Sequence, residues 1–178
     1  MPQDFPYILV RRRVKYARLE FTPQGLKLIA PDSPRFNVDA FIDRHQSWIK
    51  KKMVLYRELS NAGNYPLVDR SLPEFKRLIS EYSALAGAAY SARPRAITFR
   101  TMKNRWGSCS SEGELKFNNN LRFLPDELVR YIVYHEVCHL RVAKHGPKFK
   151  RLLYAQFPNA KEMDRQLLGY WHQIHKAK

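Results

Sequence analysis

The amino-acid sequence predicts an α+β fold, in which strands and helices occupy separate stretches of the chain. Three observations lead to this prediction. Apolar and charged residues alternate near the N-terminus, apolar residues recur at helical spacing in several later segments, and short segments with strand character lie between two of these helices. With 178 residues, of which 44% are hydrophobic, the chain is long enough for one ordinary domain with a sizeable core.

Residues 1–60 are predicted to form an N-terminal lobe. From residue 7 to residue 30, β-branched and aromatic residues alternate with charged ones, and a Pro-Gln-Gly turn divides them, so we expect a β-hairpin or a small meander. Apolar residues follow at helical spacing over residues 38–59, with Asn37 as the N-cap. Residues 61–72 contain Gly, Asn and Pro and are predicted to be a connector.

Residues 73–178 are predicted to form the catalytic domain, unless the whole chain is one continuous domain. Pro125 begins a helix in this region at the first-turn position, where its missing N–H costs nothing. A Gly- and Ser-rich turn is expected over residues 107–113. Further helices are expected over residues 73–90, 147–157 and 160–172, and strands over residues 96–101 and 114–118.

The chain is strongly basic. Lys and Arg number 32 against 16 Asp and Glu, which gives a net charge of +16. Such an excess attracts nucleic acids, nucleotides or acidic proteins. The basic residues are scattered in short clusters, so charge alone does not define a site. The candidates for polyanion contact are Lys144, Lys148, Lys150 and Arg151, which lie close to the motif described below.

The sequence also bears on the compartment of the protein. No apolar run approaches the roughly 18–20 residues that cross a bilayer. Near the N-terminus, basic residues follow a short apolar stretch, which is the reverse of a secretory signal. Two cysteines, Cys109 and Cys138, are too few for a disulfide framework, and we expect both to be reduced. These observations predict a cytoplasmic protein without membrane contact.

The strongest functional signal is His135-Glu-Val-Cys-His139, an HExxH motif on the predicted amphipathic helix. Residues four apart project from one face of a helix, with their side-chain roots about 5–6 Å apart. Two imidazoles placed in this way can converge on one Zn²⁺ at about 2.0–2.1 Å each. Glu136 lies about 60° from His139 around the helix axis. Its longer side chain therefore reaches a water on the metal without ligating the metal.

A third histidine is available to complete the site. A catalytic zinc ordinarily has three protein ligands and keeps one position for water. His145 lies six residues after His139, and Gly146 and Pro147 follow it, where they end the reach of the helix and let the chain turn back. We therefore predict one zinc ion per chain, held by His135, His139 and His145, with Glu136 as the catalytic residue.

Several blocks of the sequence, taken in order, resemble the YgjP-like family of predicted metal-dependent hydrolases, which is related to the SprT-type and other zincin metallopeptidases. The resemblance implies a zincin-like α+β core with a strand beside the active-site helix. It also implies a zinc site formed by the three histidines, with Glu136 as general base. Weaker similarity extends upstream, so the resemblance covers most of the chain. The blocks are Arg105-Trp-Gly-Ser-Cys109, Gly113-Glu-Leu-Lys-Phe-Asn118, Leu121 to Pro125, His135-Glu-Val-Cys-His139-Leu140 and His145-Gly-Pro-Lys-Phe149.

The chain departs from related families at two points. A metzincin has Gly where this chain has Val142, so the substrate preferences of metzincins do not transfer. SprT-type proteins often carry an extra zinc-binding segment with paired cysteines, and this chain has none.

Substrate-binding residues are less well defined in the sequence than the metal site. The candidates to hydrogen-bond a substrate oxygen are Arg105, Asn118, Asn119 and Asn120.

The predicted function is zinc-dependent hydrolysis, with a peptide or protein as the first choice of substrate, since a helix beside a strand suits an extended chain lying along a sheet edge. In this hypothesis zinc-bound water attacks the peptide bond and Glu136 accepts its proton. Three alternatives stay open: a metal-dependent hydrolase of nucleotide phosphoanhydrides (a nucleoside triphosphate pyrophosphatase), a DNA-associated protease, and a catalytically silent zinc module. The presence of Glu136 disfavours the last, because a structural zinc needs no base.

Overall fold

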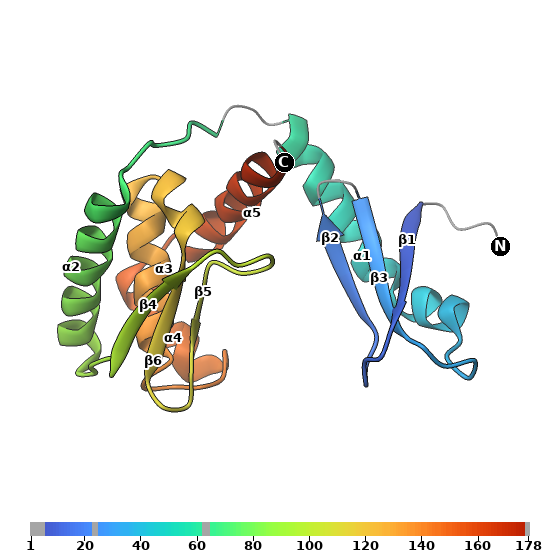
Figure 1. Cartoon of the computed structure of the whole chain (residues 1–178), viewed down its shortest axis with the longest axis horizontal. Coiled ribbons are helices and arrows are strands. Elements are labelled where there is room, and N and C mark those ends of the chain that lie inside the picture. The colour runs from blue at the N-terminus through green and yellow to red at the C-terminus, as the bar shows by residue number, and fades with distance from the viewer. Residues whose placement is uncertain (1–5, 23–24, 62–64, 177–178) are drawn as a thin grey trace. The chain divides into compact units, whose positions relative to one another are not determined.

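The computed structural model describes residues 6–22, 25–61 and 65–176 (Figure 1). Within these residues the chain forms five α-helices, one 3₁₀ helix and two three-stranded sheets, which confirms the α+β prediction. The chain divides into two compact units, which we call unit 1 (Met1–Asn64 with Trp171–Lys178) and unit 2 (Tyr65–Tyr170). None of the described helices is long and apolar enough to span a bilayer.

Unit 1 contains a sheet in the order β1 (Tyr7–Arg12), β3 (Gly25–Pro31), β2 (Arg18–Thr22). β2 and β3 pair antiparallel, as in the expected hairpin, but β1 runs parallel to β3, so the sheet is not a meander. The predicted turn residues 23–24 lie outside the described residues. β3 carries the fewest charged residues of the three strands and has residues 28–30 buried, which suits the central position. A meander would instead place the more charged β2 in the centre.

The helix α1 (Val38–Asn61) packs on this sheet. The side chain of Asn37 accepts a hydrogen bond from the backbone N–H of Ala40 at 2.9 Å, so Asn37 caps the helix as predicted. Two fully buried residues of α1, Ile42 and Ile49, cluster with the buried side chains of β3. Unit 1 therefore has a small hydrophobic core of its own.

Unit 2 contains the second sheet, in the order β4 (Ala96–Arg100), β6 (Glu114–Asn118), β5 (Gly107–Cys109). β4 is parallel to β6, and β5 is antiparallel to it. The strand β5 lies in the segment predicted to be a turn, so that prediction is wrong for residues 107–109. Its sequence, Gly-Ser-Cys, has no β-branched or aromatic residue to indicate a strand. It forms because β6 offers a partner edge, with Gly107 opposite Phe117.

In unit 2, helices pack beside the small sheet. The helix α3 contacts α2, α4 and β5, so it lies beside the small sheet as expected. Pro125 occupies the N-cap position of α3, with extended ψ of 150°, rather than its first turn. The elements are α2 (Leu72–Tyr90), the 3₁₀ helix η1 (Asn119–Phe123), α3 (Asp126–Cys138), α4 (Pro147–Gln156) and α5 (Ala160–Lys176).

Residues 65–71, the second half of the predicted connector, form no helix or strand but are held on unit 2 (Figure 1). The backbone N–H of Val68 donates to a carbonyl of η1 at 3.0 Å. One nitrogen of the Arg70 guanidinium donates to two backbone carbonyls at the end of η1, at 3.0 and 2.6 Å, and another pairs with Asp126. Residues 62–64 lie outside the described residues. The division into lobe, connector and catalytic domain stays a prediction.

Removing the Arg70 guanidinium should destabilise the protein. The Arg70 side chain is only 12% exposed, and Arg70→Ala would leave two carbonyls without their donor. Together, the two hydrogen bonds from the charged guanidinium contribute about 2 kcal/mol to the free energy of unfolding. We therefore expect the Tm to fall by roughly 4–8 °C. Thermal unfolding followed by circular dichroism measures the effect. Arg77→Ala, at an exposed position of α2, is the matched control, and an equal Tm for both variants would contradict the bracing role.

The two ends of unit 2 are in contact. The ring of Tyr65 lies edge-on to that of Tyr170, with the centroids 5.1 Å apart. The Tyr65 ring also lies over Gly169, where a Cβ would come within 2.1 Å of the ring. The Tyr170 hydroxyl donates to the carbonyl of Pro66 at 3.4 Å. Only glycine at position 169 leaves room for this packing.

Candidate metal centre

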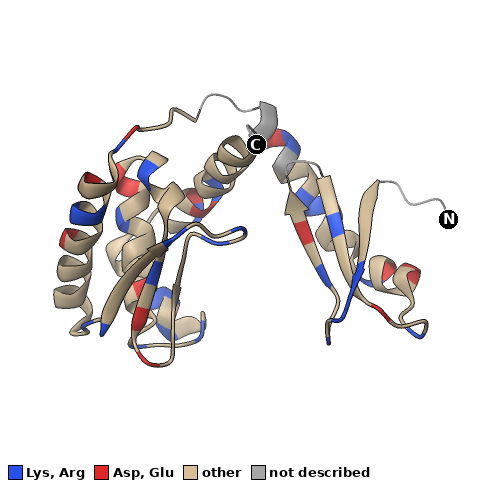
Figure 2. Ribbon diagram, viewed as in Figure 1, with Lys and Arg blue, Asp and Glu red and all other residues tan. Residues whose placement is uncertain are grey.

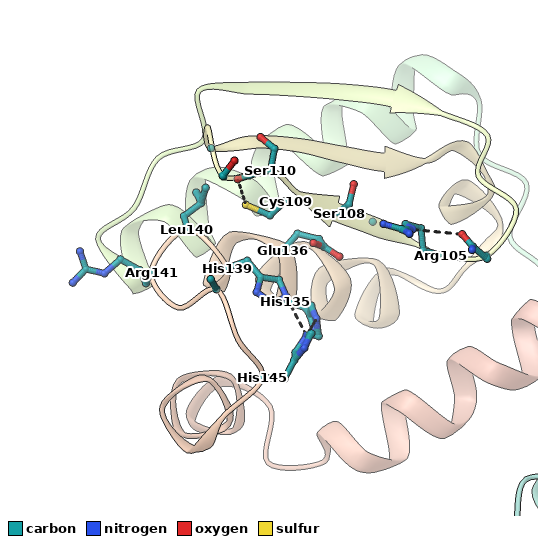
Figure 3. Close-up of a pocket in the computed structure, with 15 residues that line it drawn as sticks. Arg105, Ser108, Cys109, Ser110, His135, Glu136, His139, Leu140, Arg141 and His145 are labelled. Atoms are coloured by element: carbon teal, nitrogen blue, oxygen red, sulfur yellow. Dashed lines mark hydrogen bonds between the residues drawn. The ribbon is translucent and has the colours of Figure 1, made fainter. Parts of the chain in front are cut away.

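Three imidazoles converge in unit 2 (Figure 3). His135 lies in the last turn of α3, His139 is the C-cap residue of that helix, and His145 lies in the loop before α4. The Nε2 atom of His145 is 2.9 Å from Nε2 of His135 and 3.0 Å from Nε2 of His139. One nitrogen from each ring lies within 4.8 Å of the other two. The structure thus brings together the three histidines that the sequence selected.

The loop that carries His145 is shaped by its own backbone. After α3, the N–H groups of residues 140 and 141 bond to the carbonyls of Val137 and Cys138, which tightens the helix end into a turn. Gly146 then serves as the N-cap of α4, and Pro147 occupies its first turn. The chain therefore reverses between His139 and α4, and His145 returns to the end of α3.

A buried aromatic ring supports the three imidazoles. Phe149, in the first turns of α4, is 2% exposed. Its ring centroid lies 4.9 Å from that of His135, 4.6 Å from His139 and 4.7 Å from His145. One apolar ring therefore packs against all three histidines. Phe149 belongs to a family block in the sequence, which by itself indicates no role for it.

Two of the imidazoles, His135 and His139, are held in the neutral form that a metal requires. Burial lowers the pKa of His135 to about 3, with further lowering by the neighbouring His139 and His145. Burial also lowers the pKa of His139. Nδ1 of His139 lies 3.2 Å from the carbonyl of Val142. A carbonyl only accepts, so Nδ1 carries the hydrogen and the Nε2 lone pair faces the other rings.

This set of donors fits a tetrahedral metal. Nε2 of His145 lies 2.9–3.0 Å from two other Nε2 atoms, and wherever no hydrogen stands between two of these nitrogens, their lone pairs oppose each other. A cation between them removes that conflict. Zinc bonds of about 2.0–2.1 Å in tetrahedral geometry separate two ligand nitrogens by roughly 3.3 Å, which is close to the spacing here. The three histidines therefore fit zinc in both chemistry and size.

Glu136 is buried beside the histidines. Its side chain is 7% exposed, and burial raises its pKa to about 7, while the charge of Arg105 acts in the opposite direction. The strand β5 forms the wall against this carboxylate. A Cβ added at Gly107 would lie 2.7 Å from Cγ and Oε1 of Glu136, so any other residue at position 107 displaces the side chain. Gly107 belongs to one of the family blocks in the sequence, but the sequence alone does not reveal this contact.

A cleft of about 930 Å³ opens over the centre. Its lining includes the three histidines, Glu136, residues 104–111 except Trp106, and Arg141. Of the residues predicted to bind substrate, Arg105 is exposed and lines the cleft. The cleft thus joins the end of α3 to the edge strand β5.

The three candidate asparagines do not line this cleft. Asn118 is buried, and its amide donates to the carbonyls of Met102 and Arg105 at 2.9 and 2.8 Å. Its oxygen accepts from the N–H of Asn120 at 3.1 Å. The Asn119 amide donates to the hydroxyl of Thr101 at 3.4 Å. Asn118 therefore supports the loop that carries Arg105, and the placement gives no support for substrate contact by the asparagines.

The basic candidates lie close to the centre but outside the cleft. All four are exposed, on the loop after α3 and on α4: Lys144, Lys148, Lys150 and Arg151. Figure 2 shows Lys and Arg distributed along both units rather than gathered on one element. Polyanion contact by these four residues stays a prediction.

Two solved metallopeptidase zymogens are similar in structure. Pyrococcus abyssi abylysin is 22% identical, covers 51% of this chain and 91% of its own, and has a TM-score of 0.47. Methanocaldococcus jannaschii jannalysin is 23% identical, covers 56% of this chain and 96% of its own, and has a TM-score of 0.44. No curated protein matches the chain.

The sequence model of one family, described as "YgjP-like, metallopeptidase domain", matches residues 65–169. The match covers 105 of the 178 residues, which is most of unit 2, and includes every residue that lines the cleft. The family name agrees with the three converging histidines, because a metallopeptidase requires a divalent metal. The chain therefore belongs to the family of YgjP-like metallopeptidase domains, and it is a metal-dependent hydrolase.

Proposed function

We propose that this protein is a zinc-dependent peptidase in which His135, His139 and His145 hold the metal and Glu136 is the general base. The observation that carries the proposal is the convergence of three imidazoles, on one phenylalanine ring, beside a buried carboxylate. A structural zinc site is closed by four protein ligands, whereas a catalytic site has three and keeps a position open. Three ligands at an open cleft therefore support catalysis.

The surroundings of Glu136 suit a proton acceptor. When bound, zinc lowers the pKa of a coordinated water to about 7 and polarises the scissile carbonyl. The pKa of Glu136, raised to about 7 by burial, matches the operating range of a general base that later returns the proton to the leaving group. The absence of a side chain at Gly107 leaves the space beside β5 that the carboxylate occupies. Arg105 adds a positive charge that favours the ionised, proton-accepting form.

The edge of the sheet supports an extended peptide as the substrate. β5 pairs with β6 along one side, and no strand among the described residues pairs with its other side. Gly107, Ser108 and Cys109 of β5 all line the cleft. A peptide lying along this free edge could extend the sheet by backbone hydrogen bonds. Its scissile bond would then pass the end of α3.

The metal assignment predicts the zinc content of variants. The purified protein should contain about one zinc per chain by mass spectrometry, and chelation should abolish hydrolysis. His145→Ala should weaken zinc binding at least 100-fold, since even changes behind the ligands cost 10–100-fold. His45→Ala, at a histidine of unit 1 that bonds to the Phe41 carbonyl, is the matched control. Wild-type zinc affinity in His145→Ala would remove His145 from the ligand set.

A further inference from the structure

The exposed charged side chains that line the cleft are all positive. Besides its histidines, the lining contains three charged residues: Arg105, Glu136 and Arg141. Glu136 is buried, whereas Arg105 and Arg141 are exposed. The nearby acid Glu112 lies in the turn between two lining residues but does not itself line the cleft. A substrate entering the cleft therefore meets two guanidinium groups and no exposed carboxylate of the lining.

The two arginines flank the centre. Arg105 comes from the loop before β5, and Arg141 from the turn after α3. Figure 3 shows them on opposite sides of the group formed by the histidines and Glu136. Within the described part of the chain neither forms an ion pair, and Arg105 donates a hydrogen bond to the neutral side chain of Asn104 at 3.5 Å. Both are therefore available to a substrate carboxylate.

We propose that the cleft selects peptides with acidic side chains near the scissile bond, and that Arg141 is a residue that determines this specificity. The inference rests on the peptidase function proposed above. A guanidinium presents a planar pair of donors that matches a carboxylate. An extended peptide that crosses the centre passes between the two arginines, so acidic residues on either side of the cleaved bond meet a positive partner. The net charge of +16 adds a long-range attraction for such substrates.

Arg105 and Arg141 differ in what their replacement would change. The positive charge of Arg105 acts on Glu136: it lowers the pKa of this carboxyl group, whereas burial raises it. A change at Arg105 would therefore alter the proposed base together with the substrate site. The charge of Arg141 does not shift the pKa of Glu136. Arg141 is consequently the cleaner position for a test of specificity.

The test compares matched peptides on the zinc-loaded, full-length protein. Fluorogenic decapeptides carry Glu, Gln or Lys at each of three positions on either side of a common scissile bond. We expect kcat/KM to fall in the order Glu, Gln, Lys, by about three- to fivefold at each step, which is the range of exposed charge pairs. The preference should shrink as the salt concentration rises from 50 mM to 500 mM, because exposed charges are screened.

Charge reversal identifies the residue responsible. Arg141→Glu should invert the order, so that Lys peptides become the better substrates, and Arg141→Gln should reduce it to near equality. Lys161→Glu, at an exposed position of α5 outside the cleft, changes the net charge by the same amount and should leave the order unchanged. Thermal unfolding confirms that each variant is folded, and Arg141→Gln serves as the test if Arg141→Glu is not.

The outcomes separate this inference from the proposed function. Equal rates for the Glu, Gln and Lys series would overturn the specificity and leave the peptidase intact. An inversion caused equally by Lys161→Glu would also overturn it, since the overall charge would then be responsible. Hydrolysis of nucleoside triphosphates without cleavage of any peptide would overturn the peptidase function itself, and the specificity with it.

Discussion

Glu136→Gln should lower the kcat for peptide hydrolysis by roughly 10²–10⁴-fold, the usual contribution of general acid–base catalysis, while zinc stays bound. Glutamine has the shape of glutamate and fills the same buried space against Gly107, but it does not accept the proton. The variant should therefore fold and bind metal like the wild type. Zinc content and single-turnover rates, measured on the same preparation, show whether the loss lies in the chemical step.

The control for this variant is Glu127→Gln. Glu127 is an exposed acid in the first turn of the same helix, so its replacement changes the charge of α3 without reaching the cleft. Its kcat should stay within about twofold of the wild type, as expected of a surface substitution. If Glu136→Gln loses zinc but keeps its activity per bound zinc, the role of Glu136 is structural and the proposed mechanism is wrong.

Gly107→Ala should lower kcat by about 10²-fold, because a displacement of about 1 Å in a catalytic group has a cost of that order. The added Cβ would lie 2.7 Å from Cγ and Oε1 of Glu136 and 2.9 Å from Cδ. The carboxylate therefore has to move, while the three histidines do not contact position 107 in this way. Zinc content should consequently be retained. We therefore expect the variant to lose turnover but to keep its zinc.

A double-mutant cycle tests whether Gly107 acts through Glu136. In a Glu136→Ala background the clashing atoms are gone, so adding Gly107→Ala should reduce neither the residual rate nor the Tm further. Gly146→Ala is the control for an added methyl near the centre, since nothing lies within 4 Å of a Cβ there. Additive losses from Gly107→Ala and Glu136→Ala would show that Gly107 matters for another reason.

The HExxH motif could be read from the sequence because its geometry is local. His135 and His139 are one helical turn apart, and helix periodicity alone brings their rings to one side. His145 was also found, because Gly146 and Pro147 signal a chain reversal at the right distance. The structure places all three rings together. Their roles as ligands, and that of Glu136 as base, are proposals that the experiments above test.

Features that depend on distant pairing could not be read in the same way. β5 has no strand propensity of its own, and it forms only because β6 presents an edge. The importance of Gly107 is visible only once that strand lies against Glu136. Asn118 looked available to a substrate, yet its amide bonds to the carbonyls of Met102 and Arg105 instead. The order of the first sheet likewise depends on the pairing of β1 with β3, from which β2 separates it in the sequence.

The contact of Tyr65 with Gly169 and Tyr170 means that the first and last residues of unit 2 lie side by side. The N- and C-terminal ends of residues 65–170 are therefore adjacent in space. Domains with adjacent ends tolerate insertion into other proteins and circular permutation. A permuted chain that joins the two ends and opens elsewhere on the surface should therefore keep the histidines, Glu136 and β5 in register. We therefore expect unit 2 to keep this arrangement when other sequences are joined to its two ends.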